Sequence, residues 1–128
     1  MKATLTGPPA DSSPTVSISE DDTWTWNADL GKAYVCVNVR TTPPQSFVSA
    51  DIYGPNGYHA STNGKWPLGA DGSRQLSAPA TQPGDYTKTL VVYDASGNQT
   101  ATVTKTFTVA APGTDGPTTD PPCPKPTE

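Results

Sequence analysis

The sequence predicts an all-β protein, an antiparallel β-sandwich of about seven or eight short strands. Three observations lead to this prediction. Short segments of alternating apolar and polar residues recur along the chain, turns rich in Gly, Pro and Asn separate them, and no longer segment shows a helical period. The length of 128 residues fits one domain with flanking segments.

Proline gathers at the two ends and divides the chain into three parts. Residues 1–13 are polar and contain Gly-Pro-Pro, so we expect an extended N-terminal arm. The sandwich is predicted over residues 14–111. Residues 112–128 hold no apolar side chain that could anchor a core, and they predict a largely extended, Pro/Thr-rich C-terminal tail.

The first predicted strands contain four of the nine valines and two of the three tryptophans. Trp24 and Trp26 fall on the same side of a strand, and one of them is expected in the core, because a sandwich poor in Leu and Ile needs large aromatic side chains. In the third strand, the valines form the core face and Cys36 lies on the opposite face. The acidic residues 20–22 are expected to form a solvated turn. The strands are predicted at 14–19, 23–30 and 32–41.

The second half begins with less regular strands, predicted at 46–54, 58–62 and 73–78. Between the last two lies a loop, 63–73, that holds an isolated Trp66 beside Pro67. This tryptophan is the best candidate for an exposed contact residue.

The last predicted element is a hairpin over 84–109, whose second strand carries threonine at every second position. Threonine is favoured in strands, so a solvated outer face is the first interpretation. Binding of ice or sugar by the row is an alternative. Val91 and Tyr93, however, interrupt the array on the first strand.

This hairpin resembles the closing hairpin of bacterial immunoglobulin-like domains, over about a fifth of the chain. Tyr86 matches the tyrosine corner of that fold. The antibody-type disulfide is missing, since Lys88 stands two residues after Tyr86. Lys88 and Lys105 both fall in an inward phase, and we expect their ammonium groups to reach water at the end of the sandwich. The matching residues are Gly84, Tyr86, Leu90, Val92, Asp94, Gly97, Asn98, Phe107 and Val109.

The sequence offers no catalytic motif, and we predict a protein that is not an enzyme and needs no cofactor. His59 is the only histidine and has no supporting nucleophile motif, so a surface role is favoured. Residues 20–22 could join Asp94 in a calcium site, but their spacing fits no known loop, and a solvated turn is favoured.

The two cysteines, Cys36 and Cys123, lie in a strong strand and in the proline-rich tail. Pairing cannot be read from sequence, and a bridge between them is one alternative. Two free thiols are the favoured interpretation.

The net charge of −4 and a pI near 4.7 argue against two classes of partner. Nucleic acid and anionic membranes both need clustered Lys and Arg, which this chain lacks. The N-terminal segment also lacks the apolar stretch of a secretory signal. Synthesis in a host cytoplasm is therefore expected, with an extracellular location as the alternative.

These expectations fit a phage virion protein, most of all a head decoration protein on the virion surface that docks on the major capsid protein or another virion protein. Host cell-surface carbohydrate is a further candidate partner. One alternative is a carbohydrate-binding or adhesive accessory domain of a secreted bacterial protein, and another is an appendage of a phage tail or baseplate. The candidate partner-binding residues are Leu5, Pro8, Pro9, Trp66, Pro121, Pro122 and Cys123.

Overall fold

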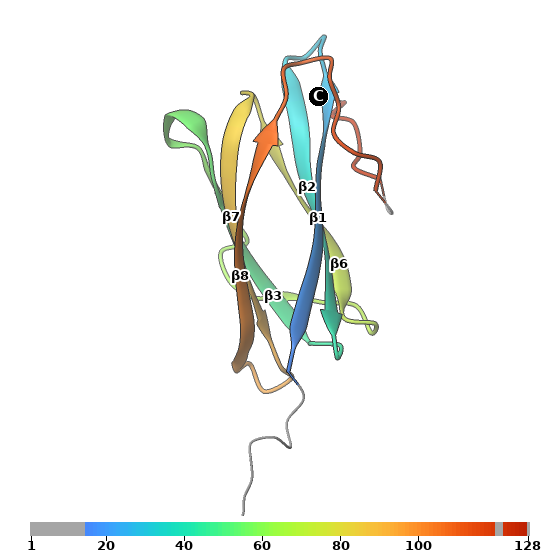
Figure 1. Ribbon diagram of the computed structural model, residues 1–128, viewed down its shortest axis with the longest axis vertical. Coiled ribbons are helices and arrows are strands. Elements are labelled where there is room, and N and C mark those ends of the chain that lie inside the picture. The colour runs from blue at the N-terminus through green and yellow to red at the C-terminus, as the bar shows by residue number, and fades with distance from the viewer. Residues whose placement is uncertain (1–14, 120–121, 128) are drawn as a thin grey trace, which may run out of the picture.

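The computed structural model describes residues 15–119 and 122–127, which form two packed antiparallel β-sheets (Figure 1). The predicted all-β, antiparallel β-sandwich is confirmed. One short 3-10 turn, η3 (Pro55–Gly57), interrupts the strands, and no helix in this described part is long and apolar enough to cross a membrane. The strands are β1 (Ser17–Asn27), β2 (Lys32–Thr42), β3 (Phe47–Tyr53), β4 (His59–Ser61), β5 (Trp66–Pro67), β6 (Ser73–Ala80), β7 (Gly84–Tyr93) and β8 (Gln99–Val109).

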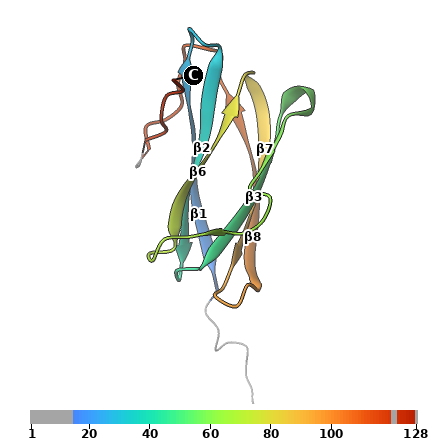
Figure 2. The ribbon, with the colours of Figure 1, turned by 180° about the vertical axis from the view of Figure 1, so that it is seen from behind.

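The strand order divides the chain into a three-stranded and a five-stranded sheet. The first sheet has the order β1-β2-β6. The second has the order β4-β3-β7-β8, and β5 pairs with β3 at its edge. In the view from behind, β1, β2 and β6 lie on the left, and β3, β7 and β8 of the second sheet lie on the right (Figure 2). Each sheet therefore has one inner face in the core and one outer face.

Strand β1 is longer than expected, and the predicted turn at residues 20–22 is wrong. The strand continues without interruption, and it pairs with β2 over its whole length. The acidic residues fit because their side chains alternate: Asp21 points outward to Arg40, whereas Glu20 and Asp22 point inward and contact Lys88. A buried cation thus replaces the water that the sequence interpretation assigned to these carboxylates.

The valines of β2 lie in the core as predicted. The side chains of Val35, Val37 and Val39 are at most 1% exposed. Trp26 is buried and Trp24 packs partly buried against the same cluster, which confirms a core role for one of the pair.

Tyr86 forms the centre of an aromatic group at one end of the core. Its ring is fully buried, contacts Tyr58 edge-on and stacks on Phe107, and its hydroxyl donates a hydrogen bond to the carbonyl of Gln82. Gly54 packs so closely that an added Cβ would lie 2.5 Å from the ring. This close approach requires glycine at position 54.

Burial of the tyrosine group gives a pH dependence. Desolvation, assisted by the neighbouring Tyr86, raises the pKa of Tyr58 to about 12. The phenol is neutral in both states below pH of about 10, and above that value the unfolded chain loses the proton first. We therefore expect the stability that Tyr58 contributes to be lost as the pH rises from about 10 to about 12.

The measurement is urea unfolding at a series of alkaline pH values, with tyrosinate absorbance followed in parallel. Tyr58→Phe, which has no group to titrate, should show a shallower loss of stability over the same window. An identical pH dependence in the two proteins would contradict this account.

Candidate interaction surfaces

The C-terminal tail folds back onto the three-stranded sheet (Figure 1). It first runs along the free edge of β1. There the Gly116 amide donates to the carbonyl of Trp24 at 2.9 Å, and the Trp26 amide donates to Oδ1 of Asp115 at 2.9 Å. An unpaired strand edge is a template for aggregation, and the tail blocks part of it.

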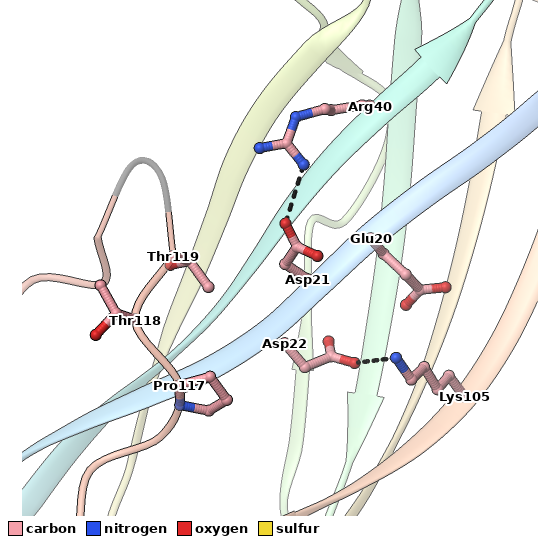
Figure 3. A pocket seen from close by; sticks show the side chains of 8 residues that line it. All are labelled: Glu20, Asp21, Asp22, Arg40, Lys105, Pro117, Thr118 and Thr119. Atoms are coloured by element: carbon pink, nitrogen blue, oxygen red, sulfur yellow. Dashed lines mark hydrogen bonds and ion pairs between the residues drawn. The ribbon is translucent and has the colours of Figure 1, made fainter.

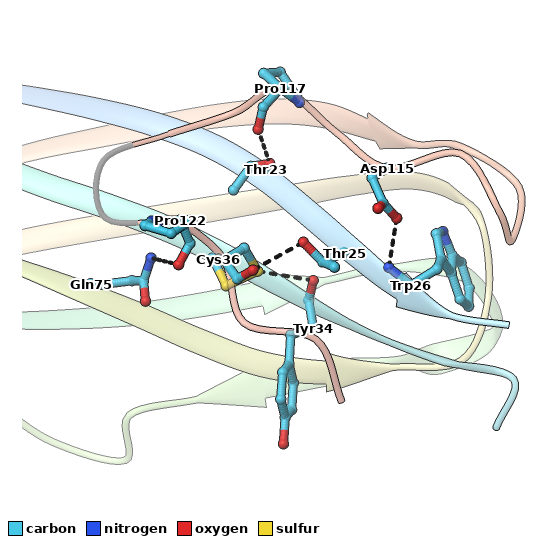
Figure 4. Close-up of a disulfide and its surroundings, with 10 residues drawn as sticks. Thr23, Thr25, Trp26, Tyr34, Cys36, Gln75, Asp115, Pro117 and Pro122 are labelled. Atoms are coloured by element: carbon cyan, nitrogen blue, oxygen red, sulfur yellow. Dashed lines mark hydrogen bonds between the residues drawn. A yellow bond between two sulfur atoms is a disulfide. The ribbon is translucent and has the colours of Figure 1, made fainter. Parts of the chain in front are cut away.

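The tail then crosses the outer face of the same sheet (Figure 4). Side chains that point outward donate hydrogen bonds to its carbonyls: Thr23 to Pro117, Thr25 to Cys123 at 3.1 Å, and Gln75 to Pro122 at 3.3 Å. Asn27 donates to Pro126 at 2.8 Å in the same way. Proline-rich chain suits this role, because its carbonyls have no internal partners.

A disulfide between Cys36 and Cys123 fastens the tail, so the preference for two free thiols is wrong (Figure 4). The Cα atoms are 5.7 Å apart, within the range that disulfides need. Cys36 lies on the outer face of β2, as expected, but it is fully buried. Its cover is the tail, whose return path does not follow from the local sequence.

The structure describes only some of the predicted docking residues. Pro122 and Cys123 are bound to the chain's own sheet, so they are part of the sandwich rather than a free arm. Leu5, Pro8, Pro9 and Pro121 lie outside the described residues.

The described tail covers the outer face of the three-stranded sheet and leaves the outer face of the five-stranded sheet open. Threonine hydroxyls pair across β7 and β8: Thr87 with Thr106 at 3.0 Å, and Thr89 with Thr104 at 3.2 Å. Thr108 donates to Asp85 at 2.6 Å. The hydroxyl row thus faces outward, where its groups pair with each other and leave further lone pairs exposed.

Beside the threonines, β3 and β4 present a compact aromatic group. Tyr53, which is 52% exposed, stacks in parallel on His59 with ring centroids 4.3 Å apart. His59 Nε2 lies 3.1 Å from Asp51 Oδ1. Sequence reasoning placed His59 on the surface but missed its two neighbours. Asp51 and Tyr53 share one phase of β3, and the Gly-Pro-Asn-Gly turn that follows brings β4 back beside them.

Trp66 lies in β5 at the edge of the same sheet and is 38% exposed. Its indole nitrogen donates to the carbonyl of Thr62 at 2.9 Å, and the Arg74 guanidinium lies over the ring at 4.9 Å. The ring is therefore held in place while part of it stays open to solvent, as a contact residue requires.

The structure contradicts the expectation for one of the two inward-phase lysines. Lys88 is fully buried, so the prediction that its ammonium reaches water is wrong; Lys105, by contrast, is half-exposed.

The acidic residues considered for a calcium site lie apart. Asp94 accepts hydrogen bonds from the amides of Ser96 and Asn98 in the hairpin turn, whereas Glu20 and Asp22 face Lys88. Within residues 15–119 and 122–127, no group of three or more His, Cys, Asp or Glu side chains could hold a metal ion.

Comparison with known proteins adds no relative: no protein-family model matches the chain, and no curated protein matches it.

Proposed function

We propose that this chain is a non-enzymatic phage virion protein, a head decoration protein that docks on the major capsid protein and displays the sandwich on the outer surface. One observation supports this most: the chain fixes its tail over one sheet by a disulfide and leaves the polar face of the other sheet open. A displayed domain needs both a fold that survives outside cells and a free face.

The start of β1 and the start of the tail lie at opposite ends of the sandwich, which suits display. The start of β1 lies at the end that carries the β7–β8 turn, whereas the tail leaves β8 at the opposite end (Figure 1). Because the tail is bound to its own sheet, we assign docking to the segment that precedes β1. The open sheet face would then reinforce the shell through neighbouring copies or bind host surfaces weakly, with many copies making weak sites effective.

The test is co-sedimentation of the purified protein with phage capsids that lack it. We expect saturable binding that is lost on removal of residues 1–13. Leu30→Ala, a change of an exposed side chain between β1 and β2, serves as the control and should bind as wild type does. Binding that is absent, or that survives removal of residues 1–13, would contradict the docking assignment.

A second candidate is a carbohydrate-binding accessory domain of a secreted bacterial protein. The exposed ring of Tyr53, which lies opposite Thr87 of the hydroxyl row, favours it, since aromatic faces and hydroxyl groups are what a sugar ring contacts. The partly exposed ring of Trp66 at the edge of the sheet is a second aromatic surface. A panel of insoluble polysaccharides, run beside the capsids, tests it. Retention on one polysaccharide that Tyr53→Ala or Trp66→Ala abolishes, without capsid binding, would establish this second function and overturn the first.

A further inference from the structure

A buried lysine lies between two buried carboxylates inside the sandwich. Lys88 of β7 is 0% exposed, and its Nζ contacts both Glu20 Oε1 and Asp22 Oδ1, whose side chains on β1 are 7% and 5% exposed. The ring of Phe107 lies 5.8 Å from the same nitrogen. The amine and both acids are thus held together in a largely apolar interior, on strands from different sheets.

The stability of the fold alone does not explain why these three charged side chains are buried together. Burying ions is costly, and apolar residues of similar volume often serve a core equally well. The arrangement is, however, suited to a reaction. An amine and a carboxyl group held in contact react as one molecule, with a very high effective concentration and little competition from water.

We propose that Lys88 and Asp22 condense into an intramolecular amide bond that joins β7 to β1. Asp22 is the acceptor because both of its oxygens are positioned: Oδ1 contacts Lys88, and Oδ2 lies 3.4 Å from the ammonium of Lys105. Oδ2 has no hydrogen bond within the described part of the chain, so it is open to that cation. Glu20, the second acid on the amine, is the proton carrier.

The steps balance without any further reactant. Glu20 takes a proton from the Lys88 ammonium and passes it to Oδ1 of Asp22, and the freed lone pair then attacks Cγ of the neutral carboxyl group. An N–C bond forms, and negative charge develops on Oδ2, where Lys105 stabilises it. The bond from Cγ to Oδ1 then breaks. Oδ1 leaves as water with two of the original ammonium protons, transferred through Glu20, which returns to its carboxylate form.

The leaving water has a route out. Glu20, Asp22 and Lys105 also line an open groove of about 570 Å³ between β1 and the tail (Figure 3). The product would be a covalent tie between the two sheets that thiol reductants do not cleave. It is therefore chemically independent of the Cys36–Cys123 disulfide, and it does not depend on the proposed function.

Intact-mass measurement of the reduced, denatured wild-type chain tests the proposal. We expect a mass lower than that of the sequence by one water, and fragment spectra in which Lys88 and Asp22 are joined. The unchanged sequence mass would overturn the proposal. So would a water loss mapped to Asp71–Gly72, where an aspartyl-glycine pair can close into a cyclic imide, or an amide from Lys88 to Glu20.

Variants of Lys88, Asp22 and Glu20 test the role of each residue in the reaction. Lys88→Met and Asp22→Ala should show the full mass, and Glu20→Gln should leave most of the chain unreacted although the side chain keeps its shape. Lys65→Met removes an exposed lysine over the ring of Tyr93 and is the matched control, which should still lose water. Loss of water in Lys88→Met would also refute the assignment. The wild-type mass decides the question even if a variant fails to fold.

Discussion

Reduction of the Cys36–Cys123 disulfide is expected to lower the free energy of unfolding by roughly 4 kcal/mol. The bridge joins residues 87 positions apart and therefore closes most of the chain into one loop. A cross-link of that span restricts the unfolded chain by roughly 4–5 kcal/mol on the loop-entropy scale. Reduction also removes the covalent link between the tail and β2, so that only hydrogen bonds hold the tail over the buried Cys36.

Urea unfolding of the wild type with and without a thiol reductant measures the effect. Cys123→Ser is the control, because it removes the bridge and should unfold at the same urea concentration under both conditions. Equal stability of oxidised and reduced wild type would show that the bridge does not constrain the chain. If the proposed amide is present, the reduced protein keeps its mass deficit of one water, so the two cross-links are measured separately.

Tyr86→Ala is expected to destabilise the domain by about 3–5 kcal/mol, the range for removal of a large core aromatic. The change would leave a cavity between Tyr58, Phe107 and Gly54, all of which contact the ring or lie closely against it. Tyr86→Phe keeps the ring and removes the hydrogen bond to Gln82, and should cost about 1 kcal/mol.

The measurement is the urea midpoint at neutral pH. Tyr53→Ala, a tyrosine that is 52% exposed on the outer face, is the matched control and should change stability by only about 0.5 kcal/mol or less. A loss for Tyr86→Ala no larger than that control would contradict the placement of Tyr86 at the centre of the core.

The sequence predicted the features that depend on local alternation. The valines of β2 alternate with polar residues, and they lie in the core as expected. The β7–β8 hairpin follows from alternation on both sides of a glycine-containing turn, and its threonines face outward. These predictions succeed because a strand places successive side chains on opposite faces, whatever it packs against.

Features that depend on distant partners were missed. The acidic residues of β1 suggested a turn, because carboxylates normally need water, and only the packing of β7 against β1 supplies Lys88 instead. Cys36 could not be paired with Cys123, since the return path of the tail is set by hydrogen bonds from side chains on the sheet.

The sequence by itself determined the class of fold, the core face of each regular strand and the closing hairpin. Only the tertiary structure decided that the tail covers one sheet, that a disulfide holds it there, and that Lys88 meets two acids in the interior. The physical reason is the range of the interactions. The alternation of side chains is a property of each strand's own sequence. A cross-link or a buried ion contact, by contrast, forms only when two strands, or a strand and the tail, have come together.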